Sequence, residues 1–155
     1  IWRDDVYHYV GASTLHKPTN LEICGIIDDV WINPQEKLII VDYKSTSTSK
    51  EISLEDEYKQ GYKKQLEIYQ WIFREMGFTV NDTGYFVYAN GIKERDSFDA
   101  KLEFEMLILE HEGDTSWVEP TVGEIKGCLD CDEIPEVGER CEHCEYRRLI
   151  GEAGG

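Results

Sequence analysis

Two aspartates and a lysine have the types and spacing needed to hold a metal ion beside a phosphate. Asp42 and Lys44 follow the apolar run 38–41 and lie two positions apart. In a strand, side chains at i and i+2 point to the same face, so a carboxylate and an ammonium leave the sheet together. Asp28 can arrive beside them on a neighbouring strand, because cross-strand neighbours lie ~5 Å apart. Two acids that hold Mg²⁺ or Mn²⁺, with a lysine beside them, can hydrolyse a phosphodiester.

The first acid of this set has an alternative in Asp29. A single aspartate in such a place is usually a solvated strand-end acid, but here a second acid, Asp42, follows on the next strand of the same hairpin. We prefer Asp28 as the ligand for its Gly-x-x-Asp spacing from Gly25, and we assign Asp29 an outward role. The backbone carbonyl of Tyr43 is a further candidate ligand, since hard cations also take carbonyl oxygens.

Two pairs of polar residues lie one helical turn apart on the following segment. Gln65 and Tyr69 share a face, where Gln65 interrupts the edge of an apolar stripe and can bind a phosphate or hold the catalytic strand. Tyr69 taken alone also fits a core aromatic. Lys59 and Lys63 are candidates for contact with a nucleic-acid backbone, and a solvated helix face explains them about as well.

These residues need a hairpin and a covering helix to meet. We expect a helix over 53–76, where apolar residues recur every three or four positions, with Ser53 as its N-cap and Gly77 at its end. The remaining patterns predict strands at 13–17, 21–31, 38–44 and 83–89, a half-exposed strand over 98–108, and a helix over 120–128. The result is an α/β fold with a mixed central sheet flanked by helices, whose core spans 1–127.

The motifs Gly25-x-x-Asp28, Asp42-Tyr43-Lys44 and Gln65-x-x-x-Tyr69, in this order, resemble the PD-(D/E)XK nuclease superfamily. More narrowly, they are similar to the RecB-like branch, which includes the CRISPR-associated RecB-like exonucleases. The resemblance covers about residues 20–75 and, loosely, the Cys-rich tail. It implies a restriction-endonuclease-like fold and divalent-metal-dependent cleavage of DNA. By it, Asp28 and Asp42 would be ligands, Lys44 catalytic, and Gln65 and Tyr69 supporting.

Members of this branch often add a histidine ligand from a helix before the first strand. The histidines upstream are His8, in a poorly patterned start, and His16, in an expected strand. Because the chain opens on Ile1 rather than Met, we expect a fragment whose upstream part is missing.

Four cysteines form a second candidate metal site. Cys128-x-x-Cys131 and Cys141-x-x-Cys144 can close a tetrahedral zinc site within a tail that spans 128–155 and packs on the core. The resemblance suggests an iron–sulfur cluster as the alternative, and thiolates suit either metal. Cys24, between Ile23 and Gly25, is expected to be a small core residue.

Composition sets limits on the function. The net charge of −16 excludes a protein that coats nucleic acid by charge alone. Much of this charge lies in residues 101–145, which hold 14 acidic and 3 basic residues. Between residues 44 and 64, in contrast, the lysines and the acidic residues nearly balance, so a surface that faces phosphates is expected there. No apolar run approaches a membrane span, and cytoplasmic is the default location.

From this we expect a metal-dependent deoxyribonuclease, an exonuclease, that acts on DNA in repair, recombination or CRISPR adaptation, with possible protein partners from such a complex. One alternative is a catalytically inactive nuclease-fold domain that binds nucleic acid or protein. The other is a zinc-ribbon interaction module, for which the upstream part is only a scaffold.

Overall fold

The computed structural model describes residues 11–94, 100–133, 135–138 and 140–153. Its strands are β1 (Ala12–His16), β2 (Leu21–Gly25), β3 (Asp29–Ile32), β4 (Leu38–Thr46), β5 (Thr83–Gly91) and β6 (Phe104–Glu112). Its helices are α1 (Gln60–Glu75), α2 (Val118–Leu129) and α3 (Glu142–Ala153), and a 3-10 turn, η1 (Glu57–Lys59), leads into α1.

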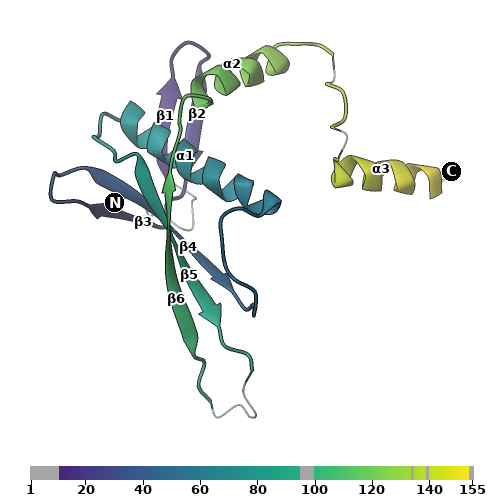
Figure 1. Cartoon of the computed structure of the whole chain (residues 1–155). Coiled ribbons are helices and arrows are strands. Elements are labelled where there is room, and N and C mark those ends of the chain that lie inside the picture. Colours follow the sequence, from purple (N-terminus) through teal and green to yellow (C-terminus); the bar gives the residue numbers. More distant parts are fainter. Residues whose placement is uncertain (1–10, 95–99, 134, 139, 154–155) are drawn as a thin grey trace.

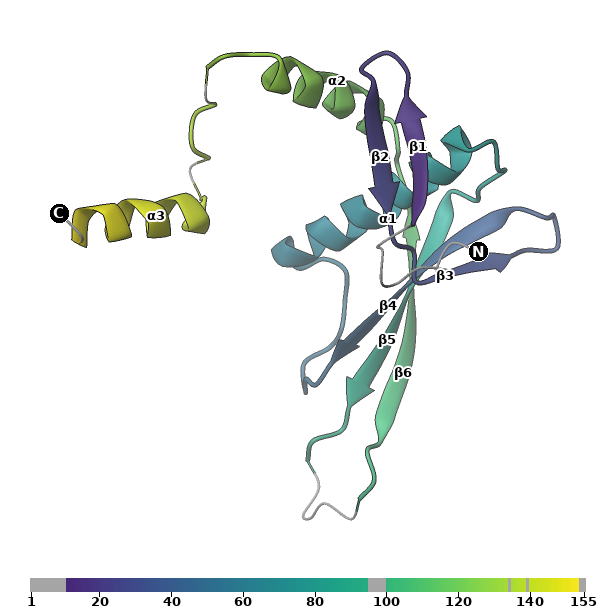
Figure 2. The same cartoon turned by 180° about the vertical axis from the view of Figure 1, so that it is seen from behind.

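A four-stranded mixed sheet forms the centre, in the order β3-β4-β5-β6. The outer pairs, β3 with β4 and β5 with β6, are antiparallel, whereas β4 and β5 are parallel. Helix α1 makes the crossover between the two parallel strands and lies across the sheet, while β1 and β2 form a separate antiparallel hairpin (Figures 1 and 2). The mixed α/β architecture expected from the sequence is therefore present.

Strand β4 is buried on both faces, as its apolar run predicts. Leu38 and Ile40 belong to the main core, whereas Ile39 and Val41 pack with Val87 in a second cluster. Alternation along a strand sends these two sets to opposite faces. Asp42 comes next in the same buried run, so the fold carries its carboxylate into a desolvated place.

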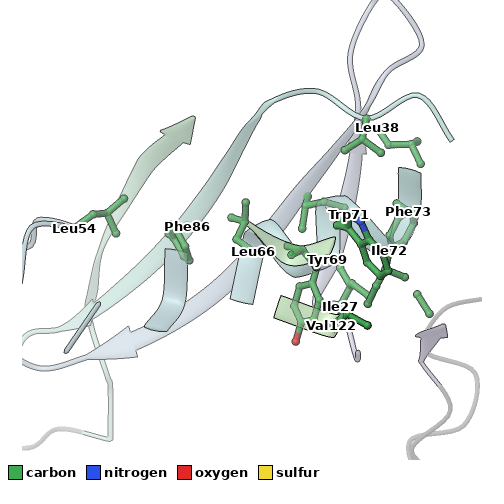
Figure 3. Packing of buried hydrophobic residues seen from close by; sticks show 14 of the residues in the cluster. Ile27, Leu38, Leu54, Leu66, Tyr69, Trp71, Ile72, Phe73, Phe86 and Val122 are labelled. Carbon is green, nitrogen blue, oxygen red and sulfur yellow. The ribbon is translucent and has the colours of Figure 1, made fainter. Parts of the chain in front are cut away.

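Helix α1 supplies much of the main core through its Leu66, Tyr69, Ile72 and Phe73 side chains (Figure 3). It ends as predicted at Gly77, whose φ of +91° suits a residue without a Cβ. The amide of Phe78 then donates to the Phe73 carbonyl at 3.0 Å, and the two rings pack 5.7 Å apart. This pattern is typical of a glycine-terminated helix with an apolar contact across its end.

The predicted start of this helix is wrong. No cap forms at Ser53; the helical segment begins with η1 at Glu57, and α1 itself begins at Gln60. Ile52 and Leu54 are both buried, which is the spacing of an extended segment rather than a helix. The Lys59 ammonium donates to the Ser53 carbonyl at 2.6 Å, which fixes this extended stretch against the turn.

Four other boundaries differ from those expected. The segment 21–31 is not one strand, because the chain breaks between β2 and β3 at residues 26–28. The strands expected over 38–44 and 83–89 each run two residues further, to Thr46 in β4 and to Gly91 in β5. The predicted strand over 98–108 begins at Phe104, and its first residues, 98 and 99, lie outside the described residues.

The helix expected over 120–128 is confirmed as α2, which runs two residues further back and one further on. Helix α3 was not expected and stands apart from the sheet in both views (Figures 1 and 2). Cys24 is exposed rather than in the core, because Leu21 and Ile23 are the β2 residues that face inward. Within the described residues, no helix is long and apolar enough to cross a membrane.

Candidate active site

Asp28 and Asp42 come together at the base of the β3–β4 hairpin. The register pairs Asp29 with Val41, and its continuation places Asp28 opposite Asp42. Asp28 stands in the break before β3, where its Oδ2 accepts a hydrogen bond of 2.9 Å from the Tyr43 amide. This bond holds the Asp28 carboxylate beside the segment of β4 that carries Asp42 and Lys44.

Asp42 is the buried member of the pair, with 3% of its surface exposed. Burial raises the pKa of its carboxyl above the ordinary value; the Lys44 ammonium opposes this rise, and the nearby Asp28 charge adds to it. Lys44 Nζ lies 2.5 Å from Asp42 Oδ2. Within the described part of the chain, this oxygen still receives no well-directed hydrogen bond. The Lys44 ammonium offsets part of the cost of burying this carboxylate, and a metal ion bound to it would offset more.

Lys44, Gln65 and Tyr69 form a chain of contacts from β4 to α1. Lys44 Nζ donates to Gln65 Oε1 at 3.4 Å, and Gln65 Nε2 donates to the Tyr69 hydroxyl at 2.8 Å. The Tyr69 ring packs in the core (Figure 3), where burial raises the pKa of its phenol. The Asp42 and Asp28 charges raise it further, which places the hydroxyl within electrostatic reach of both acids.

Asp29 has a different environment from Asp28. Its Oδ1 accepts from the Val30 amide at 2.8 Å, and its Oδ2 accepts from the Trp31 indole at 3.2 Å and from the Tyr43 hydroxyl at 2.7 Å. Both carboxylate oxygens therefore hold the hairpin itself. This placement agrees with the outward role expected for Asp29 and leaves Asp28 as the acid beside Asp42.

A family model described as the PD-(D/E)XK nuclease superfamily matches residues 4–149. The chain belongs to this superfamily. No curated protein and no solved structure matches it. The PD-(D/E)XK membership indicates a nuclease, and members of the superfamily typically use Mg²⁺ or Mn²⁺.

The residues of this PD-(D/E)XK site fit such an ion. Asp42 offers a buried oxygen that lacks a directed hydrogen bond, and Asp28 offers its second oxygen on the neighbouring segment. Oxygen ligands from carboxylates are what these hard cations take. Two acids are a small set, since no group of three or more acidic, histidine or cysteine side chains converges within the described ranges. Water and phosphate oxygens would therefore complete the shell.

The two lysines expected at the nucleic-acid backbone of this PD-(D/E)XK protein are not solvated. Lys59 is 5% exposed, and its ammonium pairs with Asp56 at 2.8 Å and with the Ser53 carbonyl. Lys63 pairs with Glu55 at 3.3 Å. The alternative of a solvated helix face does not fit Lys59, because the segment before α1 folds over it. Contact of either lysine with nucleic acid stays a prediction.

The predicted four-cysteine zinc site does not assemble in the described residues of this PD-(D/E)XK chain, and neither does the iron–sulfur alternative. Cys128 and Cys131 lie at the end of α2, whereas Cys141 and Cys144 open α3. The two helices lie apart in both views (Figures 1 and 2). Cys141 instead contacts Cys144, whose thiol lowers the pKa of the Cys141 thiol by hydrogen bonding; the Cys144 amide, 3.4 Å from Cys141 Sγ, lowers it further.

Neither upstream histidine can be placed as a ligand. His16 ends β1 at the turn of its hairpin, and its ring nitrogens contact Thr19 and Glu119, each at 2.7 Å. Gly25, which leads to the site, pairs with Ala12 at the other end of that hairpin. His16 thus joins the β1–β2 hairpin to α2, and His8 lies outside the described residues.

Sequence reasoning missed a buried carboxylate on the other side of α1. Glu67 accepts from the Trp117 indole at 2.6 Å and from the Asp114 amide at 3.3 Å, and it contacts His111 Nε2 at 2.8 Å. The sequence signal that could have indicated this buried carboxylate is the charged Glu67 between the apolar Leu66 and Ile68. Its partners come from β6 and from the start of α2, which only the tertiary fold brings near.

Proposed function

We propose that this protein hydrolyses phosphodiester bonds in DNA with Mg²⁺ or Mn²⁺. The observation that carries the proposal is the buried Asp42 carboxylate, which stands beside Lys44 and Asp28 with an oxygen that lacks a directed hydrogen bond. Such an arrangement raises the free energy of the metal-free protein and is repaid by a bound cation. Natural proteins keep costly groups of this kind mainly at functional sites.

Each residue has a role in this proposal. When bound, the ion polarises the phosphate and lowers the pKa of a water. Asp28 and Asp42 hold the ion, and the Tyr43 carbonyl is the further candidate ligand. Lys44 orients the attacking water and offsets the charge that develops on the phosphate. Gln65 restrains the Lys44 ammonium, and Tyr69 restrains Gln65 in turn.

The finer assignments belong to the same proposal. They are a RecB-like exonuclease that works in repair, recombination or CRISPR adaptation, with protein partners from such a complex, in the cytoplasm. The alternative is an inactive nuclease-fold domain that binds nucleic acid or protein, which the net charge of −16 favours because a catalytic surface must still approach phosphates. The contacts between Lys44, Asp42 and Gln65 favour the active enzyme.

The test is cleavage of end-labelled single-stranded and duplex DNA in Mg²⁺ and in Mn²⁺. The wild type should cleave in either ion and stop in EDTA, while Asp42→Asn should lose cleavage at least 100-fold. Asp130→Asn, which changes an exposed aspartate at the C-terminal end of α2, is the matched control and should keep wild-type rates. A folded wild type that leaves all substrates intact in both metals would overturn the proposal in favour of the binding domain.

A further inference from the structure

A cleft of about 290 Å³ opens beside Lys44, and most of the residues that line it have no role in the proposed reaction. Its walls are the end of β4, the segment 48–56 and the first turns of η1 and α1, with Tyr88 of β5 also lining it. The residues that matter for its chemistry are Thr46, Thr48, Lys50, Tyr58, Tyr62 and Tyr88. Because Lys44 lines the cleft and also contacts Asp42, any group bound there lies next to the reacting phosphate.

Tyr88 gives the cleft an unused hydrogen-bonding group. The residue is 3% exposed, and its hydroxyl has no hydrogen-bond partner among the residues that the structure describes. A buried hydroxyl without a partner costs about 1–3 kcal/mol, so a ligand that supplies one gains from it. Burial raises the pKa of this phenol, which therefore keeps its proton to donate.

Aromatic rings form the outer part of the cleft. Tyr58 is 69% exposed, and its ring meets the ring of Tyr62 edge-on at 6.4 Å and 87°. Lys44 Nζ lies 4.5 Å from the centre of the Tyr62 ring, so this ring also holds the catalytic ammonium in place. Lys59 Nζ lies over the Tyr58 ring, 5.4 Å from its centre, and the exposed part of the ring still offers solvent a flat apolar surface.

The charges of the cleft are nearly neutralised. Lys59 pairs with Asp56, and Lys44 pairs with Asp42, which leaves Lys50 and the adjacent Glu51 as the remaining charged residues of the lining. A pocket for a terminal phosphate would need unpaired cations. Flat aromatic surface, hydroxyls and a lone buried phenol instead match a nucleobase, which has a π-face and polar edges.

We infer that this cleft binds one unpaired base of the DNA strand, next to the phosphate that Lys44 and Asp42 serve. The base stacks on Tyr58 and accepts a hydrogen bond from the Tyr88 hydroxyl. A base inside a duplex is stacked and paired and cannot enter such a cleft without leaving the helix. The substrate is therefore single-stranded at this position. This inference rests on the proposed function and names its substrate class.

The experiment measures binding without cleavage. Fluorescence anisotropy in EDTA at low salt compares a labelled 12-nucleotide single strand with its duplex, on the wild type and on Tyr58→Ala and Tyr88→Phe. Tyr146→Ala removes a tyrosine that is equally open to solvent on α3, and Tyr85→Phe removes a hydroxyl from the other face of β5; these are the matched controls. Tyr88→Phe deletes one oxygen, so it tests the cleft without emptying the core.

The single strand should bind the wild type at least tenfold more tightly than the duplex. Tyr58→Ala should raise the dissociation constant for the single strand about 5- to 100-fold, the range of one base stacked on an aromatic ring. Tyr88→Phe should raise it about three- to tenfold. Both controls should stay within twofold. Equal affinity for duplex, or wild-type affinity in Tyr58→Ala and Tyr88→Phe, would overturn the inference. Because the readout needs no turnover, a loss of cleavage alone would contradict only the proposed function.

Discussion

The backbone of Gly25 lies directly against the ring of Tyr69. A Cβ added at residue 25 would lie 2.3 Å from Tyr69 Cε1 and 2.9 Å from Cδ1, distances that real contacts do not reach. Tyr69 is packed in the core and its hydroxyl is held by Gln65. Gly25 therefore sets how closely the Gly25-x-x-Asp28 segment approaches Tyr69 on α1.

Gly25→Ala should damage the site through this contact. We expect the Tyr69 ring to be displaced, with an unfolding free energy lower by about 1–3 kcal/mol, which is typical of overpacking. Cleavage should fall at least tenfold because Gln65 loses its anchor. Gly61→Ala is the control, since a Cβ there meets nothing within 4 Å and α1 should gain stability. Urea unfolding and cleavage rates measure both effects; equal behaviour of the two variants would contradict the role of the contact.

The sequence predicts this site better than it predicts the elements around it. Spacing alone places Asp42 and Lys44 on one face of β4, and the hairpin brings Asp28 to them. The sequence does not predict the Gly25–Tyr69 contact or the break at residues 26–28, because both depend on how α1 packs against the hairpin. Ser53 was mistaken for a cap because Ile52 and Leu54 find burial as an extended segment, a tertiary effect that overrides local preference.

The pH dependence of metal binding should report Asp42. Its pKa is raised, so the ion-binding carboxylate form is lost at a higher pH than for an ordinary aspartate as the solution is acidified. Mn²⁺ affinity, measured by calorimetry from pH 7 downward, should therefore weaken before exposed aspartates titrate. Lys44→Ala removes a positive charge that lowers this pKa, so the Mn²⁺ affinity of this variant should be lost at a still higher pH. If both proteins lose Mn²⁺ affinity at the pH expected for an ordinary aspartate, Asp42 is not a ligand.

The same raised pKa makes a prediction for stability. A group whose folded pKa lies above its unfolded value stabilises the fold at low pH, and that contribution is lost as the pH rises through the folded pKa. Asp42 should thus weaken the metal-free protein at pH 7. Asp42→Asn should melt no lower than the wild type in EDTA, and Mn²⁺ should raise the melting temperature of the wild type only. Stabilisation of both proteins by Mn²⁺ would place the ion elsewhere.

Lys44, Gln65 and Tyr69 should act as one unit. Lys44→Ala should lower cleavage about 100- to 1,000-fold, the usual loss of one charge-stabilising group. Gln65→Ala should cost about tenfold, and Tyr69→Phe less, because each acts through the next residue. A double-mutant cycle on the last two should show effects that do not add. Additive losses would show that Tyr69 supports the fold independently of Gln65.

Glu67 should have a structural role, in contrast to the catalytic roles proposed for Asp28 and Asp42. Its removal leaves the Trp117 indole and the Asp114 amide without their acceptor, so Glu67→Ala should lower the unfolding free energy by about 2–4 kcal/mol. The folded fraction should still cleave DNA at near wild-type rates. Urea unfolding and cleavage at low temperature check the two halves. A folded Glu67→Ala protein that cannot cleave would assign this acid to the site.

The neighbouring acids Asp28 and Asp29 offer the most direct test of the central claim, that Asp28 and Asp42 hold the metal that cleaves DNA. Both oxygens of Asp29 are taken by the hairpin, whereas Asp28 faces Asp42. The measurement is cleavage of end-labelled single-stranded DNA in Mg²⁺ by Asp28→Asn and Asp29→Asn, side by side. The account predicts at least a 100-fold loss for Asp28→Asn and at most a few-fold loss for Asp29→Asn. Undiminished cleavage by Asp28→Asn would contradict it.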